Sequence, residues 1–411
     1  MLSHPVTTAT LKNLRPEQTR QIDQIPKQFA SLAELKGFKF QGTDLGMGVV
    51  STLVSKVREP HPDIKLHEKN IQRMLKASAT VHCSVLNHLD EHGPVDRVYL
   101  FNGRFSLLRA AFRACQKAGV SCWIHERGRS AEYTEFYVDH MPHDIHYAVQ
   151  RMQERWEAAE PVTRRELAES FYTGRRHGRA DLWKSFTKEQ IAGKLPEGWN
   201  HDAQNVVIFN SSEDEFASIG PQWDPPIYAN QLTAFRSIVQ SLESNRPDKL
   251  EIYLRIHPNL ANASEPVVRD LLTLKRDWLH VIPPNATCSS YAMLDHCERA
   301  VTFGSTMGIE ATYWRKPSIL LGQCYYRELG ATINPIDHED FIRLLHQPVA
   351  PSPLEPALIY AHYLKTLGRK LPDFDSDQFS TGTFRGKPVR LAFPWNVAQS
   401  CVRAIRKKRI K

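Results

Sequence analysis

In the second half of the chain, short apolar runs alternate with stretches in which apolar residues recur every three to four positions. Runs of the first kind predict buried strands, and spacing of the second kind predicts amphipathic helices. The expected strands lie at 206–212, 250–259 and 278–284, the expected helices at 229–245, 267–277 and 289–297, and a strand, a helix and a strand follow over 299–322. This repeated alternation predicts a doubly wound α/β domain.

The first half carries a shorter pattern of the same kind. Residues 96–104 and 120–128 predict two strands, and residues 105–119 predict a helix between them that ends at Gly119. Strand, helix and strand with short connections form a βαβ unit, which implies parallel pairing. Because only two strands are evident, this half is either reduced or holds further strands within 36–55.

Together the two patterns predict an α/β fold with two Rossmann-like domains whose parallel sheets face a central cleft. The turn-rich stretch 194–205 separates the patterns and is the expected domain boundary. We expect an N-terminal domain over 1–198, a C-terminal domain over 199–375, and a final segment over 376–411.

Charge suggests an anionic partner. The chain of 411 residues has a formal net charge of +8, which suits a nucleotide, an acidic glycan or a lipid surface, although modest basicity is equally a solubility trait. We expect no nucleic-acid partner, because no motif interleaves basic and aromatic residues. The basic tail 403–411 would allow contact with anionic lipid, and a solvated end is the alternative.

Cysteine usage and hydropathy favour the cytoplasm. The seven cysteines form no C-x-x-C pair and no set with zinc-ligand spacing, which is typical of a reducing compartment and predicts no metal site. No apolar run approaches 18 residues, and the first residues lack the pattern of a signal peptide. We therefore expect a cytoplasmic protein, with attachment to the inner face of the membrane left open.

The stretch "RAVTFGSTMGIEATYWRKPSILLG" places Gly304, Ser305 and Thr306 where a predicted strand ends and a helix begins. A helix start at the carboxyl edge of such a sheet offers N–H groups and partial positive charge to a phosphate, and the hydroxyls add donors. Glu310, about one turn further, would accept hydrogen bonds from two ribose hydroxyls. A plain helix cap with a surface glutamate is the alternative.

A second segment supports the phosphate interpretation. In "YLRIHPN", His257 and Pro258 stand where another predicted strand ends, so the imidazole would point into the same crevice. It would donate a hydrogen bond to a phosphate, with positive charge if its pKa rises. Arg255 is expected to brace the sheet, and Asn259 to hold the loop or touch the ligand.

Polar residues also follow the two first-half strands. Arginines there would bind an anionic acceptor, Glu126 or His125 would act as general base, and Asp44 in the Gly-rich turn 42–48 is an alternative base. That turn is not a P-loop. Salt bridges on a loop would explain the same residues without function. The residues expected at this edge are Asn102, Arg104, His125, Glu126, Arg127 and Arg129.

The segment "IHPN", followed by "YAMLDHCERAVTFGSTMGIEATYWRKPSILLG", resembles the capsule polysaccharide biosynthesis proteins, which are GT-B-like glycosyltransferases related to the transferases for the acidic sugar Kdo. The resemblance covers about 205–325, and "FNGRFSLLRAAFRACQKAGVSCWIHERG" is similar to the first half of such proteins. It implies a cytidine nucleotide donor whose phosphate is held by His257, Pro258, Ser305 and Thr306.

The resulting hypothesis is a glycosyltransferase that moves a Kdo-like sugar from a nucleotide donor to a capsule or surface glycan or glycolipid. Glu126 or His125 would be catalytic, Gly304 would join the donor-phosphate site, Glu310 would bind ribose, and the acceptor would dock on Asn102, Arg104 and Arg127. No cofactor beyond the donor and no metal is expected. A nucleotide-sugar 2-epimerase and a non-catalytic capsule assembly or export factor remain as alternatives.

Overall fold

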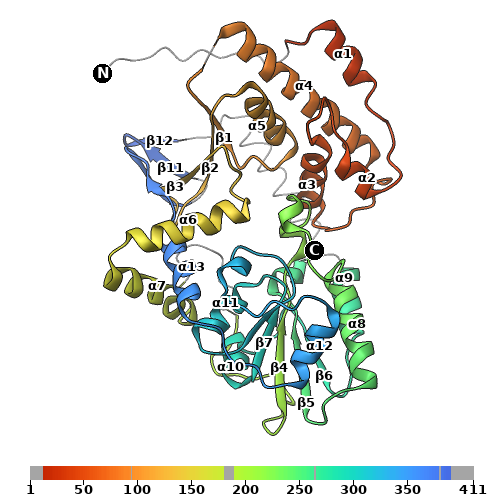
Figure 1. The fold of residues 1–411 in the computed structure, drawn as a ribbon, viewed down its shortest axis with the longest axis vertical. Helices are drawn as coiled ribbons and strands as arrows, with labels where there is room; N and C mark the ends of the chain where they lie inside the picture. The colour runs from red at the N-terminus through yellow and green to blue at the C-terminus, as the bar shows by residue number, and fades with distance from the viewer. Residues whose placement is uncertain (1–12, 94, 180–188, 263–264, 379–380, 390–411) are drawn as a thin grey trace.

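The computed structural model describes residues 13–93, 95–179, 189–262, 265–378 and 381–389 (Figure 1). The predicted basic tail, 403–411, lies outside these residues. Among the helices that the structure describes, none has both the length and the apolar character that crossing a membrane requires.

The first half begins with a cluster of helices. Leu35, Val50, Leu75 and Ala110 contribute to its core and are fully buried. No strand lies within 36–55, apart from an isolated bridge between Phe40 and Thr43, so the further strands expected as one alternative are not found in that segment. Its helices are α1 (Pro16–Asp23), α2 (Leu32–Gly37), α3 (Leu45–Val57), α4 (Glu68–His92) and α5 (Ser106–Ala118).

The predicted Gly-rich turn mostly belongs to α3. A Cβ on Gly46 would lie 1.9 Å from the carbonyl oxygen of Leu35, and one on Gly48 would lie 3.0 Å from Cδ of Arg109. These glycines therefore let α3 pack closely against its neighbours. The predicted helix end at Gly119 is confirmed, since this residue caps α5 in the left-handed conformation at φ 69°.

The first-half sheet is small and mixed. It has the strand order β1-β2-β3-β9. The predicted parallel pairing of β1 with β2 is confirmed, but β3 and β9 pair antiparallel. Its strands are β1 (Val98–Phe101), β2 (Cys122–Arg127), β3 (Tyr133–Val138) and β9 (Arg369–Lys370).

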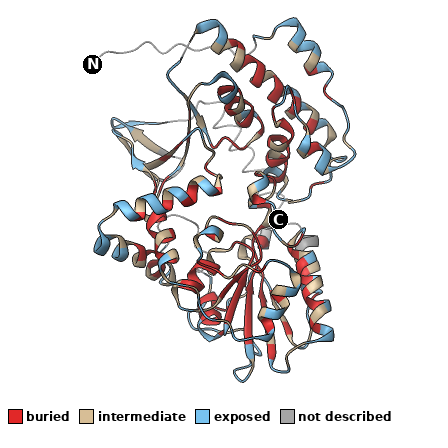
Figure 2. Ribbon diagram, in the orientation of Figure 1, coloured by how far each residue is buried: buried red, intermediate tan, exposed pale blue. Residues whose placement is uncertain are grey.

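The second-half sheet is parallel throughout, in the order β6-β5-β4-β7-β8. Figure 2 shows these strands as a buried layer. Phe235 of α8 (Gln231–Ser244) and Phe341 of α12 (His338–His346) pack against one set of strand residues. Met293 of α10 (Ser290–His296) and Ala311 of α11 (Thr306–Tyr313) pack against the other set. The strands are β4 (Gln204–Phe209), β5 (Leu250–Arg255), β6 (Leu279–Ile282), β7 (Arg299–Thr302) and β8 (Ser318–Leu320).

Both faces of this sheet are covered by helices, as a doubly wound parallel sheet requires. The predicted α/β fold class is confirmed, with the first-half sheet smaller and more mixed than expected. The helices are α8 (Gln231–Ser244), α9 (Glu265–Leu272), α10 (Ser290–His296), α11 (Thr306–Tyr313) and α12 (His338–His346).

Three helices connect the halves: α6 (Ile145–Ala158), α7 (Pro161–Arg176) and α13 (Glu355–Thr366). They share one apolar cluster with α11 and β8. After α13 the chain returns to the first half, where β9 pairs with β3. The predicted domain ranges stay predictions. A small antiparallel sheet comes next, with β10 (Phe374–Gln378), β11 (Thr381–Phe384) and β12 (Lys387–Pro388).

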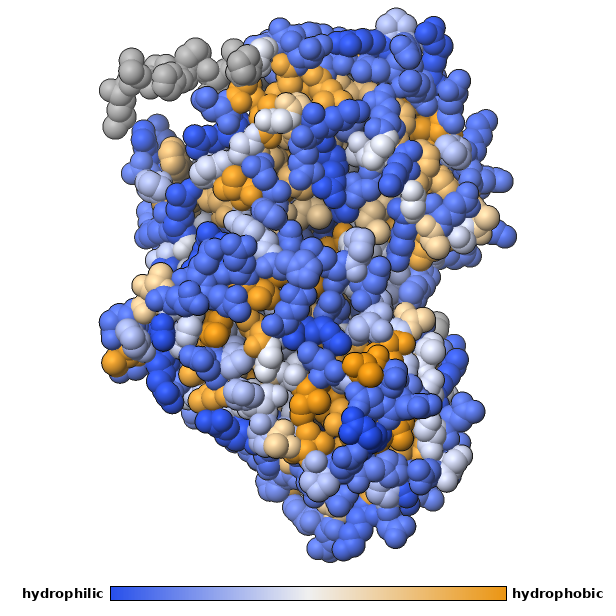
Figure 3. Space-filling view, viewed as in Figure 1, coloured by the Kyte–Doolittle hydropathy of each residue, from blue (hydrophilic) through white to orange (hydrophobic). Residues whose placement is uncertain are grey.

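Short 3-10 turns occupy several loops at the carboxyl edge of the second sheet or beside it, at η1 (Glu213–Glu215), η2 (Pro221–Trp223), η3 (Pro258–Asn262) and η4 (Arg327–Leu329). The surface on the face viewed is mostly hydrophilic, with apolar side chains gathered in patches in each half (Figure 3).

Candidate functional site

The predicted Gly-Ser-Thr junction lies between β7 and α11. Gly304 has φ 122°, a conformation that side-chain-bearing residues rarely adopt, and a Cβ there would lie 3.0 Å from the carbonyl oxygen of Gln323. Ser305 is the N-cap of α11, and its Oγ accepts from the backbone N–H of Met307 at 3.3 Å. Glycine is therefore required for the chain to turn from strand to helix at this edge.

His257 lies just beyond β5. Its backbone N–H donates to Oδ1 of Asn210 at 2.6 Å, and its Nδ1 accepts from the backbone N–H of Asn259 at 3.1 Å. Burial, together with the nearby Arg255 guanidinium, lowers the pKa of His257 to about 4. The imidazole is therefore neutral at pH 7, with its proton on Nε2, and the raised pKa that a positive charge would require is not found in this structure.

These two segments line one cavity, as the parallel arrangement of β5 and β7 predicted. Its lining includes His257, Pro258, Ser305 and Thr306, together with Arg175 from α7. The predicted donor-side groups thus meet around a single space. Their role in holding a phosphate stays a prediction.

Arg175 is a central residue that the sequence did not reveal. Its Nη2 donates to Oγ1 of Thr306 at 3.1 Å, and its Nε donates to Oε1 of Glu310 at 3.0 Å. Burial acts to lower the pKa of Arg175, but the Glu310 carboxylate outweighs burial and the pKa is raised. A permanent positive charge therefore lies beside the start of α11.

Glu310 is fully buried rather than a surface residue. One carboxylate oxygen accepts from Arg175 and the other from the hydroxyl of Tyr291. A ribose would have to displace one of these donors to reach the carboxylate. The contacts of Glu310 support a role in fixing Arg175 in place, and the ribose role stays a prediction.

A second cavity adjoins the first and reaches the first half. Arg175 and Thr306 line both cavities, and Glu126, Arg127 and His143 line the second. Oε2 of Glu126 accepts from Nδ2 of Asn102 at 2.6 Å, and its Oε1 accepts from the backbone N–H of Arg127 at 3.0 Å. The carboxylate is therefore held in a fixed orientation on the first-half side of a continuous cleft.

The structure corrects the prediction for His125. Adjacent residues of a strand point to opposite faces of the sheet, so His125 lies on the opposite face of β2 from Glu126. Its ring packs near those of Phe101 and Phe136, at centroid distances of 5.5 and 6.4 Å. It does not line the cleft cavities, and Glu126 remains the candidate base.

Arg104 is also placed differently from the prediction. It is buried, its Nε donates to Oγ of Ser51 at 2.9 Å, and its Nη1 donates to the carbonyl oxygen of Glu215 at 3.2 Å. These bonds tie the first half to a loop of the second half, so Arg104 braces the two halves instead of facing an acceptor. Asn102 is buried at φ 59° and orients Glu126.

Asp44, the alternative base, is committed to ion pairs. Arg109 and Arg113 each lie 2.8 Å from its carboxylate. Burial acts to raise the pKa of Asp44, but the hydrogen bond from Arg113 and the charge of Arg109 outweigh it and lower the pKa. A carboxylate stabilised in this way is a weak base, which removes it as a candidate. Arg129 donates to the carbonyl oxygen of Gly368 at 3.2 Å and supports the sheet edge.

His143 is a second residue that the sequence did not reveal. Its backbone carbonyl accepts from Nε1 of Trp223 at 2.7 Å. Burial, with the charges of Arg104 and Arg109, lowers the pKa of His143 to about 3. Its Nδ1 is buried and has no hydrogen-bond partner among the described residues, so a neutral imidazole stands in the wall of the cleft.

Among the described residues, no group of three or more His, Cys, Asp or Glu side chains is placed so that it could hold a metal ion. The six described cysteines are all buried, and none of them forms a disulfide. The expectation of metal-independent chemistry stays a prediction.

Comparison with known proteins supports the resemblance noted in the sequence. Residues 226–352 match the family model described as "Capsule polysaccharide biosynthesis protein". The matched segment contains His257, Gly304, Ser305, Thr306 and Glu310, so the resemblance is confirmed over the part that carries the predicted donor-binding residues. No curated protein matches the chain.

Solved structures that resemble this chain include two of KpsC from Thermosulfurimonas dismutans. The beta Kdo 2,4 transferase is 18% identical, with 72% of this chain and 84% of that chain covered at a TM-score of 0.40. The beta Kdo 2,7 transferase is 15% identical, with 74% and 85% covered at a TM-score of 0.42. A putative UDP-N-acetylglucosamine 2-epimerase from Listeria monocytogenes is 12% identical, with 69% and 77% covered at a TM-score of 0.31.

Proposed function

We propose that this protein is a glycosyltransferase of capsule or surface polysaccharide synthesis, which moves a sugar from a nucleotide-activated donor to a growing glycan or glycolipid. The family match supports the biosynthetic setting. The observation that carries the proposal is the continuous cleft, in which Arg175 and Thr306 join the cavity of His257 to the cavity of Glu126. A nucleotide-sugar donor favours the cytoplasm, at the inner face of the membrane for a lipid-linked acceptor.

The donor phosphate would bind at the start of α11. The hydroxyls of Ser305 and Thr306, the His257 imidazole and the Arg175 guanidinium line this space and would be the donors there. These groups are fixed before the substrate arrives, so they would stabilise the charge that develops on the leaving phosphate. We propose that the nucleotide of the donor is a cytidine nucleotide.

Glu126 would act as the general base toward the acceptor hydroxyl. Asn102 and the backbone N–H of Arg127 hold its carboxylate at the cleft, and Arg127 would contact an anionic acceptor. A base that removes the hydroxyl proton as the bond to the sugar forms accelerates such reactions by about 10²–10⁴-fold.

The 2-epimerase alternative is less consistent with the cleft, because that reaction needs acid and base groups on both sides of the sugar. Glu126 is the one carboxylate among the described residues that line the two cavities, and Glu310 is held by Arg175 and Tyr291. A non-catalytic assembly factor would not require a nucleotide site at all.

Calorimetric titration with CMP, CDP and UDP tests the proposal. We expect wild type to bind at least one of them, and His257→Ala and Ser305→Ala each to weaken binding about fivefold or more, as expected for a lost hydrogen bond. His346→Ala, at the exposed end of α12, is the matched control. Glu126→Gln should leave nucleotide binding intact and lower transfer about 10²-fold or more. Binding of no nucleotide would favour the assembly factor.

A further inference from the structure

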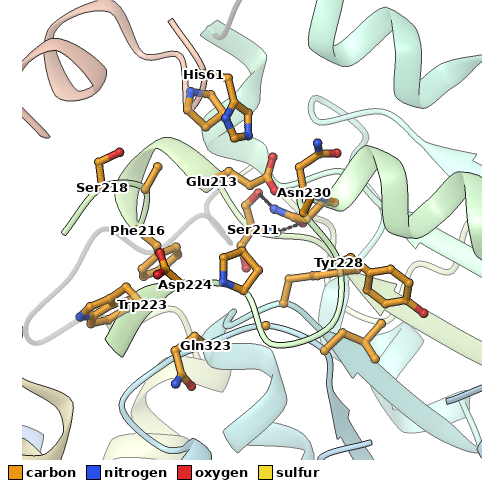
Figure 4. A pocket seen from close by; sticks show the side chains of 18 of the residues that line it. His61, Ser211, Glu213, Phe216, Ser218, Trp223, Asp224, Tyr228, Asn230 and Gln323 are labelled. Atoms are coloured by element: carbon orange, nitrogen blue, oxygen red, sulfur yellow. Dashed lines mark hydrogen bonds between the residues drawn. The ribbon is translucent and has the colours of Figure 1, made fainter. Parts of the chain in front are cut away.

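A further cavity lies on the other side of the Gly304 turn. Phe303 lines this cavity, whereas Ser305 and Thr306 line the donor-side cavity. It opens between the halves, with Lys36 and His61 from the first half and loops that come after β4, β7 and β8 from the second (Figure 4). None of the residues proposed above for catalysis or donor binding lines it.

Two serines that line this cavity have buried hydroxyls with no hydrogen-bond partner among the described residues. They are Oγ of Ser211 and Oγ of Ser218, in residues that are only 4% and 8% exposed. An unpartnered buried hydroxyl destabilises the folded protein. Ser218 also adopts φ 60°, which is uncommon for a residue with a side chain. A ligand that hydrogen-bonds these hydroxyls would supply the partners that both lack.

The surroundings of Ser211 are rigid. Its backbone N–H donates to Oε1 of Gln231 at 2.9 Å, and its carbonyl oxygen accepts from Nε2 of the same side chain at 2.9 Å. Glu213 is fixed as well, because its carboxylate accepts from the backbone N–H of Gln231 at 2.7 Å. The polar groups are thus pre-positioned, as in a binding site that is formed before the ligand arrives.

Aromatic rings form the other walls. The rings of Phe216 and Trp223 stack with centroids 5.5 Å apart and planes 9° from parallel. Tyr228 lies on the opposite side, and Asn230 and Gln323 bring amide groups (Figure 4). Apolar ring faces next to hydroxyl, amide and carboxyl groups suit a ligand with C–H faces and a rim of hydroxyls, which describes a sugar ring.

The charged residues that line this cavity differ from those that line the donor-side cavity, which is the one lined by His257, Ser305 and Thr306. Glu213 and Asp224 line it together with Lys36 and His61, and no arginine is among its described lining residues. The donor-side cavity has Arg175 and Arg255 and no carboxylate among its described lining residues. A phosphate is therefore favoured on the donor side, and an uncharged ligand is favoured here.

The cavity is not isolated. A neighbouring cavity shares Ser211, Glu213 and Asn230 with it and also includes Asn210, which lines the donor-side cavity. The three cavities therefore lie next to one another along the carboxyl edge of the second sheet. A glycan longer than one sugar would fit such a path better than a single small ligand.

We propose that this cavity is a carbohydrate subsite that binds one uncharged sugar unit through Ser211, Ser218 and the surrounding aromatic rings. That the sugar belongs to the acceptor glycan rests on the proposed function. Sugar binding itself does not depend on catalysis or on the donor.

Saturation-transfer NMR with glucose, galactose and N-acetylglucosamine as probes tests the subsite. We expect a signal from at least one sugar on wild type, and about fivefold weaker affinity for each of Ser211→Ala and Ser218→Ala, corresponding to one lost hydrogen bond. The melting temperature of both variants should stay equal or rise, because each hydroxyl is unpartnered in the protein without ligand. A purely structural hydroxyl would lower it instead.

Ser244→Ala, at the exposed end of α8, should change neither sugar binding nor melting temperature. The absence of a signal from all three sugars, or equal signals from wild type and the Ser211→Ala/Ser218→Ala double variant, would overturn the subsite. If sugars bind but CMP, CDP and UDP do not, the subsite stands and the proposed transferase activity fails. If nucleotides bind and none of the three sugars does, the proposed carbohydrate subsite fails and the proposed nucleotide-binding site stands.

Discussion

The two sheets of this molecule differ in how many of their faces are covered. In the second half, every residue of β7 and β8 is buried. In the first half, β1 alternates between half-buried and exposed positions, with Tyr99 54% exposed and Phe101 47% exposed. A parallel sheet with helices on both faces can hold loops rigidly at its carboxyl edge, and a half-open mixed sheet is less constrained. His257, Ser305 and Thr306, which are proposed to bind the donor phosphate, lie at the edge of the covered sheet.

The half-open sheet contributes to the cleft through residues at the carboxyl ends of its first two strands. Glu126 near the end of β2 is held by Asn102 just after β1, while arginines carry the contact between halves. Arg104 donates to the carbonyl oxygen of Glu215, and Arg109 donates to that of Ile219 at 3.1 Å. Buried arginines of the first half therefore serve the architecture more than ligand binding.

The largest expected effect concerns Arg175, which belongs to α7 but pairs with Glu310 of α11. Arg175→Met would leave a fully buried carboxylate without its partner, so we expect a loss of about 3–5 kcal/mol in the free energy of unfolding, measured with urea. Arg165 of the same helix pairs with Glu169 at 2.9 Å on the surface, and Arg165→Met should cost at most about 0.5 kcal/mol.

A double variant sharpens this test. Arg175→Met combined with Glu310→Gln should recover part of the stability, because the second change removes the isolated buried charge. Equal losses for the Arg175 and Arg165 variants would show that α7 is not anchored to the second half through the Arg175–Glu310 pair.

A matched pair of tyrosines tests the difference between the sheets directly. Tyr253 of β5 is fully buried, stacks with Trp199 and His280 at 4.2 and 4.6 Å, and accepts from the backbone N–H of Asn200 at 3.0 Å. We expect Tyr253→Leu to cost about 2–4 kcal/mol. Tyr99→Leu on the open face should cost about 0.5 kcal/mol or less. Similar urea midpoints for both variants would mean that the first-half face is covered in solution.

Much of the fold could be predicted because the local pattern and the final environment agree. The buried strands β4 to β8 read as apolar runs, and the parallel-sheet rule correctly placed His257 and Ser305 in one cavity. β9 has two residues and exists only because it pairs with β3, more than 200 positions earlier. No local pattern encodes such a strand.

Arg175 and His143 were missed for the same reason as β9, because each depends on residues that are distant in the sequence. Arg175 became part of the site through Glu310, 135 positions away, and His143 became so through burial between the halves. The sequence around them predicts only helices that are rich in charged residues. The error on His125 was avoidable, since strand alternation alone separates it from Glu126. Buried partners such as Tyr291, in contrast, are visible only once the chain is folded.

The smallest expected effect compares histidines of the two regions across pH. The pKa of His257 lies at about 4 in the folded protein, against about 6.5 for an unperturbed histidine. Between these pH values His257 is protonated in the unfolded chain but remains neutral in the folded protein. The contribution of His257 to stability is therefore lost as pH falls from about 6.5 toward 4, and no further loss comes from it below pH 4.

From pH 7 to pH 5 this difference corresponds to about 2 kcal/mol for His257. Burial also lowers the pKa of His125, with Glu126 acting in the opposite direction, but its ring lies on the half-open sheet. Urea unfolding at both pH values should show that His257→Gln removes about 2 kcal/mol of the acid-induced loss, while His125→Gln removes clearly less. If His125→Gln removes as much, the imidazole of the first half is as strongly desolvated as that of the second. The open face of β1 to β3 would then be closed to water.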